Sequence, residues 1–386
     1  MHLRISYVTE TFPPEINGVA ATVVRFVEHL RVQGWQVDLV RPRQPHEAGR
    51  ETADELLTRG LPLPMYPDLR LGLVRSADLA ARWRAAPPAL VHVATEGPLG
   101  SAAIKAARAL GLPVTSDFRT NFPAYSRHYR LGWAEGLVLS YLRRFHNRTR
   151  RCFVPTPTLK EELERTGFER VAVVGRGIDT TRFSPALRCT ALRSSWGADD
   201  EAPVLLYVGR LAAEKNVALA FAAHRALARH APQTRLVVVG DGPLRERLQR
   251  AHPDAIFAGP RRGDDLARHY ASADVFLFPS LTDTFGNVVL EALASGLLVV
   301  AYDYAAARVH LRAGANGLSA APGDDAGFVA AAIEAATRLP RLAHLRAAAR
   351  ATAESLSWDR IAQDFESHLL DVMREPAPGA APVATA

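Results

Sequence analysis

The sequence predicts a two-domain α/β protein in which each domain is a mostly parallel sheet wrapped by helices. Three observations support this prediction. Short apolar strands alternate with amphipathic helical segments, the alternation runs through two separate series, and the chain has 386 residues of which 48% are hydrophobic. A single hydrophobic core rarely grows beyond about 250 to 300 residues, so two cores are expected.

The first series opens with a strand, a loop and a helix. Residues 3–9 are short, apolar and β-branched, and a turn-rich segment then ends at Asn17-Gly18. In the helix that follows, apolar residues recur at spacings of three and four and Gly34 is placed to end it. This stripe consists of Val19, Val23, Val27 and Leu30. Further strands and helices of the first series are expected at 37–40, 90–93, 102–110, 113–116, 132–145 and 152–154.

The second series repeats the architecture, with strands expected at 203–209, 236–240, 255–258, 275–279 and 298–301. Between the two series, 186–202 has no sustained apolar period and is interpreted as a linker region. Ser357 is a suitable N-cap for a last helix whose apolar residues share one face. The predicted organisation is an N-terminal domain over 1–185, the linker, a C-terminal domain over 203–356, a C-terminal helix over 357–373 and a disordered tail over 374–386.

Composition excludes several classes of protein. The two cysteines, Cys152 and Cys189, form no C-x-x-C pair and have no histidine cluster nearby, so neither a disulfide framework nor a zinc site is expected. No signal peptide and no membrane span of about 18 apolar residues is evident, which leads us to expect a cytoplasmic protein. The net charge of +7 permits attraction to nucleic acid, anionic lipid or phosphorylated ligands without choosing among them.

Ligands of doubly wound sheets bind beyond the carboxyl ends of the strands, where helix N-termini present backbone N–H groups. One candidate is Gly18, which opens the first helix and would let the backbone approach a diphosphate; a simple turn glycine is the alternative. A second is the loop after the strand 203–209, in which Gly209 is followed by Arg210 and Lys215. A planar guanidinium beside a compact ammonium suits a diphosphate, although two solvated loop cations are the alternative.

The third candidate follows the strand 275–279 and carries two carboxylates eight positions apart, Asp283 and Glu291. If a helix begins near Gly286 and Asn287, its N–H groups can face phosphate or sugar oxygens. Asp283 could then accept from sugar hydroxyls and Glu291 from a ribose diol. The alternative makes Asp283 a helix cap and Glu291 a solvated residue, but an acid within an apolar run favours the binding interpretation.

Together these segments resemble the retaining glycosyltransferase family 4, whose GT-B architecture has two facing Rossmann-like domains with a cleft between them. The resemblance covers nearly the whole chain. Its most specific element is the E-x7-E motif, here Asp283 to Glu291 within FPSLTDTFGNVVLEALASG. The segments VGRLAAEKN and VVGRGIDTTRF accompany it, and the latter is similar to the NGVD segment of the family.

This resemblance implies a hexosyltransferase, mannosyltransferase-like, that uses a GDP- or UDP-sugar and acts with retention, without cofactor or metal. Arg210 and Lys215 would stabilise the departing diphosphate, Asp283 would act at the donor sugar, and Glu291 would hold the ribose. Gly18 would approach the diphosphate from the acceptor-side domain. The remaining donor-binding residues would be Gly209, Phe285, Gly286 and Asn287.

Two positions depart from the family pattern. The first acid of E-x7-E is Asp283, which keeps the charge on a shorter arm. In SDFRTNFPAYSRHYR many relatives have a histidine where this chain has Arg119. An arginine stays protonated and cannot act as a general base, so Arg119 could instead clamp a sugar or an anionic acceptor. His128 is a weaker candidate for proton handling, and a surface helix position is its alternative role.

The acceptor is left open by the sequence, with a lipid or another glycoconjugate as candidates. The helix 132–151 has an apolar stripe and a basic end without acids, which could contact anionic lipid at the inner membrane. A core-facing stripe with cations at a helix C-terminus is the favoured alternative. The stripe is Trp133, Leu137, Tyr141 and Phe145, and the basic end is Arg143, Arg144, His146, Arg148, Arg150 and Arg151. Nucleic acid is not an expected partner, because these aromatic residues are not interleaved with the cations.

Two other functions remain compatible with the motifs. One is another GT-B enzyme acting on nucleotide sugars, such as an epimerase, and the other is a nucleotide-sugar binding module without catalysis. Release of nucleoside diphosphate from a donor, as opposed to donor isomerisation or binding alone, distinguishes the three.

Overall fold

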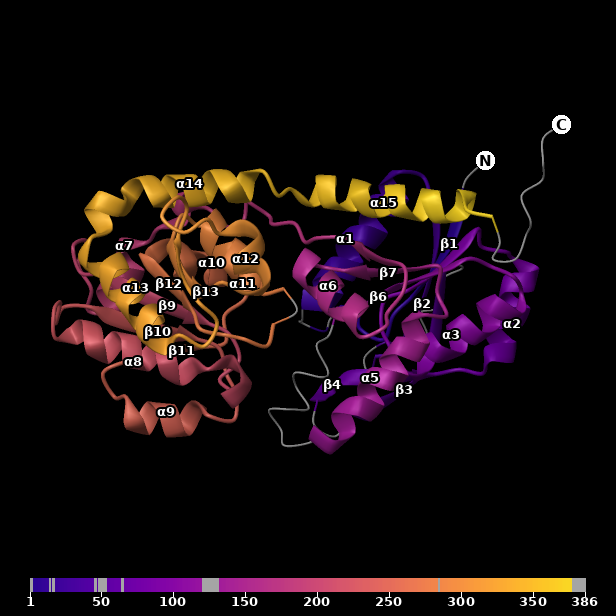
Figure 1. The fold of residues 1–386 in the computed structure, drawn as a ribbon, viewed down its shortest axis with the longest axis horizontal. Helices are drawn as coiled ribbons and strands as arrows, with labels where there is room; N and C mark the ends of the chain where they lie inside the picture. The colour runs from indigo at the N-terminus through magenta and orange to yellow at the C-terminus, as the bar shows by residue number, and fades with distance from the viewer. Residues whose placement is uncertain are drawn as a thin grey trace. The chain divides into compact units, whose positions relative to one another are not determined.

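The computed structural model describes residues 3–13, 15, 18–44, 47, 54–63, 66–119, 132–283 and 285–376. It divides the chain into two compact units (Figure 1). Of the described residues, unit 1 combines those up to Gly175 with those from Asp359 onward, and unit 2 comprises Arg176–Trp358. Unit 1 is therefore discontinuous in sequence.

Unit 1 is built on an eight-stranded sheet in the order β4-β3-β2-β1-β5-β6-β7-β8, parallel except for the β3–β4 hairpin. Its strands are β1 (Arg4–Val8), β2 (Gln36–Pro42), β3 (Glu55–Leu63), β4 (Tyr66–Leu73), β5 (Leu90–Val93), β6 (Val114–Asp117), β7 (Arg151–Val154) and β8 (Val171–Val173). Its helices are α1 (Gly18–Val32), α2 (Ser76–Ala85), α3 (Pro98–Ala109), α5 (Gly132–His146), α6 (Pro157–Arg165) and most of α15 (Trp358–Arg374).

Unit 2 is built on a six-stranded parallel sheet in the order β11-β10-β9-β12-β13-β14. Its strands are β9 (Val204–Val208), β10 (Arg235–Val239), β11 (Ile256–Gly259), β12 (Val275–Phe278), β13 (Leu298–Tyr302) and β14 (Leu318–Ala320). Its helices are η1 (Pro185–Leu187), α7 (Thr190–Ser195), η2 (Ala213–Lys215), α8 (Val217–Ala228), α9 (Arg245–Ala251), α10 (Gly263–Ser272), α11 (Asn287–Ala294), α12 (Ala305–His310), α13 (Asp325–Thr337), η3 (Leu339–Leu342) and α14 (Ala343–Glu354).

Both faces of the unit 2 sheet are buried, which explains why its strands read as continuous apolar runs. Successive residues of β9 point to opposite faces, so Val204 and Leu206 join one core while Leu205 and Tyr207 join the other. Helices therefore cover the sheet on both sides. The predicted fold class, two Rossmann-like units on parallel sheets, is confirmed in this respect.

The segment 186–202, which the sequence led us to expect as a linker, is instead part of unit 2. Arg193 is 1% exposed and donates to the carbonyl oxygens of Asp199, Ala202 and Ser272 and to the Asp274 carboxylate. A buried charge-assisted network thus replaces the apolar period that the sequence lacks.

The C-terminal helix α15 packs within unit 1 (Figure 1). The ring of Phe365 stacks on Phe26 at a centroid distance of 4.2 Å, and Glu366 accepts from Trp35 Nε1 at 2.7 Å. The helix extends to Arg374, and Glu375 forms an ion pair with Arg151, so described contacts continue past the boundary expected at 374. Residues 377–386 lie outside the described part of the chain.

Candidate active site

The candidate site in unit 2 lies where two neighbouring strands end. β9 pairs with β10 on one side and β12 on the other, so the strand order reverses direction between β9 and β12. Ligands of open α/β sheets bind at such a switch point, beyond the carboxyl ends of the strands. The two loops that the sequence singled out, after β9 and after β12, both begin there.

The β9 loop presents its two cations through a short helical turn. Gly209 follows the strand and donates its N–H to the carbonyl of Val239, and the Arg210 carbonyl accepts from the Tyr207 hydroxyl at 3.1 Å. The turn η2 ends at Lys215, and Asn216 then takes a left-handed conformation, with φ 49°, before α8 begins. Asparagine tolerates this conformation better than most residues. The backbone of the loop is thus fixed on both sides of Lys215.

A direct ion pair joins the two loops. Lys215 Nζ lies 2.7 Å from Asp283 Oδ1, and the Thr282 hydroxyl donates to the carbonyl of Glu214 at 2.9 Å. The other carboxylate oxygen, Asp283 Oδ2, is buried and has no hydrogen-bond partner among the described residues. A buried acceptor without a partner is costly unless a ligand or a rearrangement supplies a donor.

Glu214 is a site residue that sequence reasoning missed. Its side chain is 1% exposed and its Oε1 lies 3.6 Å from Arg210 Nη1. A buried carboxylate at this position orients the guanidinium and compensates part of its charge. The spacing of four between Arg210 and Glu214, within a loop that also carries Lys215, was the available signal.

The start of α11 is held by close packing behind it. Phe285 is 1% exposed, and its carbonyl accepts from the N–H of Ala306. Gly286 has φ 89°, and a Cβ atom there would lie 2.8 Å from Phe278 Cζ. A glycine is therefore required for α11 to begin with Asn287. The first N–H groups of any α-helix lack an intrahelical i−4 partner, and at this end of α11 the N–H of Val289 donates to the Gly286 carbonyl.

Glu291 lies on α11 beside Tyr270 of α10. The Tyr270 hydroxyl donates to Glu291 Oε2 at 2.8 Å. Desolvation raises the pKa of the Glu291 carboxyl to about 7, and the hydrogen bond from Tyr270 opposes that shift. Near neutral pH this carboxyl can be either an acceptor or a donor toward a ligand diol.

Arg176 is a second residue that was not predicted. It follows β8 at the start of unit 2, is 5% exposed, and donates from Nη1 to Asn287 Oδ1 at 2.9 Å. Its guanidinium carbon lies 5.7 Å from the centroid of the Phe285 ring. The sequence placed Arg176 in the NGVD-like segment, but nothing in that local pattern indicates a contact with α11.

Unit 1 carries Gly18 and Arg119 on different segments of the chain. Gly18 is the first residue of α1. Arg119 is 3% exposed and donates from Nε to Asp117 Oδ2 at 2.6 Å, and its guanidinium lies over the Phe26 ring. Burial would raise the pKa of Asp117, but Arg119 and His92 outweigh it and lower that pKa to about 2. His128 lies outside the described residues.

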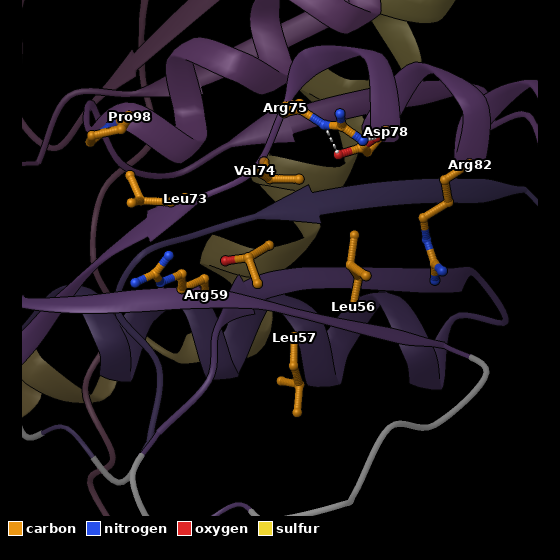
Figure 2. Close-up of a pocket in the computed structure, with 10 residues that line it drawn as sticks. Leu56, Leu57, Arg59, Leu73, Val74, Arg75, Asp78, Arg82 and Pro98 are labelled. Atoms are coloured by element: carbon orange, nitrogen blue, oxygen red, sulfur yellow. Dashed lines mark hydrogen bonds and ion pairs between the residues drawn. The ribbon is translucent and has the colours of Figure 1, made fainter.

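Two hollows lie side by side on the surface of unit 1 and share Val74. The first, about 660 Å³, is an open hollow lined by residues of β3, β4 and α2 and by Pro98 at the start of α3 (Figure 2). In Figure 2 Leu73 lies near Arg59, Leu56 and Leu57 point to opposite sides of β3, and Arg75 is paired with Asp78. The second, about 710 Å³, is lined by Val74, Ser76, Ser101, Ala102, Ile104, Lys105, Arg108 and Arg148, without an acid.

Metal ligands are not grouped in the described residues. No set of three or more His, Cys, Asp or Glu side chains there is arranged to hold a metal ion. Within the same residues, no helix is both long and apolar enough to cross a membrane.

Two units of this topology, with a switch-point site in the second, define the GT-B class of glycosyltransferase fold. The solved structure of sucrose-phosphate synthase from Thermosynechococcus elongatus matches it with a TM-score of 0.80, at 18% identity, covering 97% of this chain and 100% of that chain.

Family models agree with this class. The model described as Glycosyltransferase Family 4 matches residues 16–182, and that described as Glycosyl transferases group 1 matches 202–338. A GDP-mannose-dependent alpha-mannosyltransferase of Mycobacterium tuberculosis is 37% identical over 78% of this chain and 79% of its own length. Alpha-monoglucosyldiacylglycerol synthase of Streptococcus pneumoniae is 26% identical over 78% and 71%, respectively.

The chain belongs to glycosyltransferase family 4. The resemblance inferred from the three motifs is thereby confirmed, and with it the prediction of a hexosyltransferase that uses a nucleotide-sugar donor.

Proposed function

We propose that the chain transfers a mannosyl group from GDP-mannose to a hydroxyl of a lipid-linked acceptor, with retention at the anomeric carbon. The donor is inferred from the mannosyltransferase relative at 37% identity, and the class of acceptor from the diacylglycerol-sugar synthase. The observation that carries the catalytic part is the Lys215–Asp283 pair, which unites the ends of β9 and β12.

The charges of this site suit loss of a diphosphate. As the bond between the anomeric carbon and the β-phosphate oxygen breaks, the acceptor oxygen forms a bond to the same face of that carbon. The acceptor proton leaves toward the departing diphosphate oxygen, and GDP carries away the electron pair. Arg210 and Lys215 stabilise the negative charge that develops there. Because Glu214 and Asp283 already orient these cations, little rearrangement is needed in the transition state.

The carboxylates hold the rest of the donor. Asp283 Oδ2 accepts from a hydroxyl of the sugar while Oδ1 remains bound to Lys215. Glu291 accepts from the ribose diol, and Phe285, Gly286 and Asn287 form the floor under the phosphates, with Gly209 shaping the loop opposite. We also propose that Gly18 contributes to diphosphate binding.

In this proposal Arg119 does not clamp a sugar or an anionic acceptor, as the sequence suggested it could. Its charge is compensated by Asp117, and its guanidinium is packed over Phe26. This supports a role in fixing the end of β6, ahead of the acceptor-side segment. The role of His128 stays a prediction.

A lipid acceptor agrees with the surface of unit 1. Leu137 and Tyr141 of α5 are 68% and 46% exposed, whereas Phe145 is buried in the core, so these three residues of the apolar stripe are split between surface and core. Tyr141 hydrogen-bonds to Ser101, which lines the second hollow. Lys105, Arg108 and Arg148 of that hollow have no ion-pair partner within the described part of the chain. We propose that this face contacts an anionic membrane.

The test is a donor panel with the purified full chain and detergent-dispersed lipid acceptors. GDP-mannose is expected to release GDP and to place labelled mannose in the organic phase, whereas UDP-sugars give little of either. Donor isomerisation without transfer would favour an epimerase. Tight binding of GDP-mannose with no turnover would favour a binding module, and either result would overturn the proposal.

Two variants test the carboxylates. Asp283→Ala is expected to lower kcat by about 100-fold or more with a smaller change in donor KM, because Lys215 loses its partner and the sugar loses an acceptor. Glu291→Ala is expected to raise donor KM and lower kcat together. Arg193→Lys is a control within the same unit and should leave both parameters near wild type. Equal and negligible effects of the two carboxylate changes would refute their assignment.

A further inference from the structure

Arg176 brings a buried cation to the start of α11 from a distant part of the chain. It lies 111 positions before Asn287, yet its Nη1 donates to the side-chain oxygen of that residue at 2.9 Å. Lys215 holds the same loop at its other end through Asp283. The segment between β12 and α11 is thus fixed at both ends by cations, of which Lys215 follows β9 and Arg176 comes from the NGVD-like segment.

The hydrogen bond fixes which way the Asn287 amide faces. A guanidinium has five N–H donors and no acceptor, so only the carbonyl oxygen of the amide can meet it. The Asn287 Nδ2 group, with two donors, must therefore point away from Arg176. Asn287 is only partly buried, and it is the first residue of α11. The two N–H donors of the Asn287 side chain therefore lie at the N-terminus of α11, together with the first backbone N–H groups of the helix.

The ring of Phe285 holds Arg176 in place on another side. The guanidinium carbon lies 5.7 Å from the ring centroid, and Phe285 is 1% exposed. A cation over an aromatic face is stabilised by the ring. The ring and the Asn287 side-chain oxygen thus hold the guanidinium of Arg176 at the start of α11.

We propose that Arg176 is a positioning residue for the donor: it orients the Asn287 amide so that its N–H donors, together with α11, bind the diphosphate of the nucleotide sugar. This inference rests on the proposed donor site. It assigns a role to a residue outside the loops after β9 and β12.

Calorimetric titration of the full chain with GDP and with GMP provides the test. Arg176→Gln and Asn287→Ala are each expected to weaken GDP binding roughly tenfold or more, since hydrogen bonds to charged groups are lost or misdirected. The affinity for GMP, which lacks the second phosphate, is expected to fall less in both variants. In steady-state assays the donor KM should rise more than kcat falls. Arg176→Lys keeps a donor and a charge, and should recover part of the affinity.

Non-additivity distinguishes positioning from an independent contact. If Arg176 acts through Asn287, the double variant should bind GDP only slightly more weakly than Asn287→Ala alone. Arg193→Lys, another buried arginine of unit 2, should lower the melting temperature without changing GDP affinity. Full additivity, or a loss in Arg176→Gln that is the same for GDP and GMP, would overturn the inference. Absence of GDP binding by the unaltered chain would instead refute the donor site itself.

Discussion

At the scale of single residues, the carboxylates of unit 2 differ in what their surroundings do to them. Asp283 and Glu214 each face a cation, whereas the partner of Glu291 is the neutral Tyr270 hydroxyl. One neutral hydrogen bond compensates less desolvation than an ion pair does. Desolvation raises the pKa of Glu291 to about 7, so its protonation responds to pH near neutrality.

Donor affinity should follow that protonation. Only the ionised Glu291 carboxylate accepts two hydrogen bonds from a ribose diol, so GDP affinity should rise about tenfold between pH 6 and pH 8, as expected for one group with a pKa of about 7. Titration of GDP across this range measures it. Glu291→Gln should bind with little pH dependence, and a wild-type profile that is equally flat would contradict the assignment.

Stability should change with pH in the opposite sense. The folded pKa of Glu291 is raised from 4.5 to about 7, so between these values the folded chain holds more protons than the unfolded chain. The contribution of Glu291 to the free energy of unfolding therefore falls as pH rises through this window. Tighter binding and lower stability are two consequences of the same desolvated carboxyl group.

At the scale of elements, local patterns predicted the strands and the loops that follow them, because burial on both faces makes continuous apolar runs. They did not predict segments that depend on distant partners. The 186–202 segment is ordered by Arg193 and Asp274, which are 81 positions apart. The β3–β4 hairpin was likewise missed, since β3 contains Gly60 and Pro62 and is defined by pairing along β2.

The same limit applies to the candidate site. The sequence could predict Arg210, Lys215 and Asp283, because each follows a strand that ends at the switch point. Arg176 was not, because its partner Asn287 is remote in sequence. The apolar stripe of α5 was predicted, but which of its residues face the core depends on the neighbouring α3, and Leu137 is exposed.

The exposed face of α5 and the adjoining hollow should control membrane binding. Flotation with vesicles of phosphatidylglycerol and phosphatidylcholine is expected to recover the chain, and vesicles of phosphatidylcholine alone should not. Arg108→Gln with Arg148→Gln should reduce recovery severalfold, since each basic residue near an anionic surface contributes about 1 kcal/mol. Arg225→Gln with Arg229→Gln removes the same charge from exposed positions in unit 2. An equal loss with this control pair would contradict a role for the α5 face.

At the scale of the whole molecule, the two units should differ in what destabilises them. Phe365 of α15 is fully buried against Phe26, His92 and Phe153 of unit 1. Phe365→Ala is expected to cost about 3 to 5 kcal/mol of stability, through lost burial and the cavity left behind. Differential scanning calorimetry should show the unfolding of unit 1 moving to lower temperature.

Phe328→Ala serves as the matched variant, because Phe328 is equally buried but lies in α13 of unit 2. It should shift the other transition. If both substitutions lower the same transition, the two units do not unfold separately.

The discontinuity of unit 1 sets an order for events on the ribosome. All eight strands of its sheet have been translated by Val173, but Phe365 and Glu366 emerge only after the whole of unit 2. Until then the groove around Phe26, Trp35 and Phe153 lacks its last helix and exposes aromatic surface. The nascent chain thus exposes these aromatic residues while the whole of unit 2, Arg176–Trp358, is being translated. Unit 2 can close its cores first, and α15 covers the aromatic residues of unit 1 once it has left the ribosome.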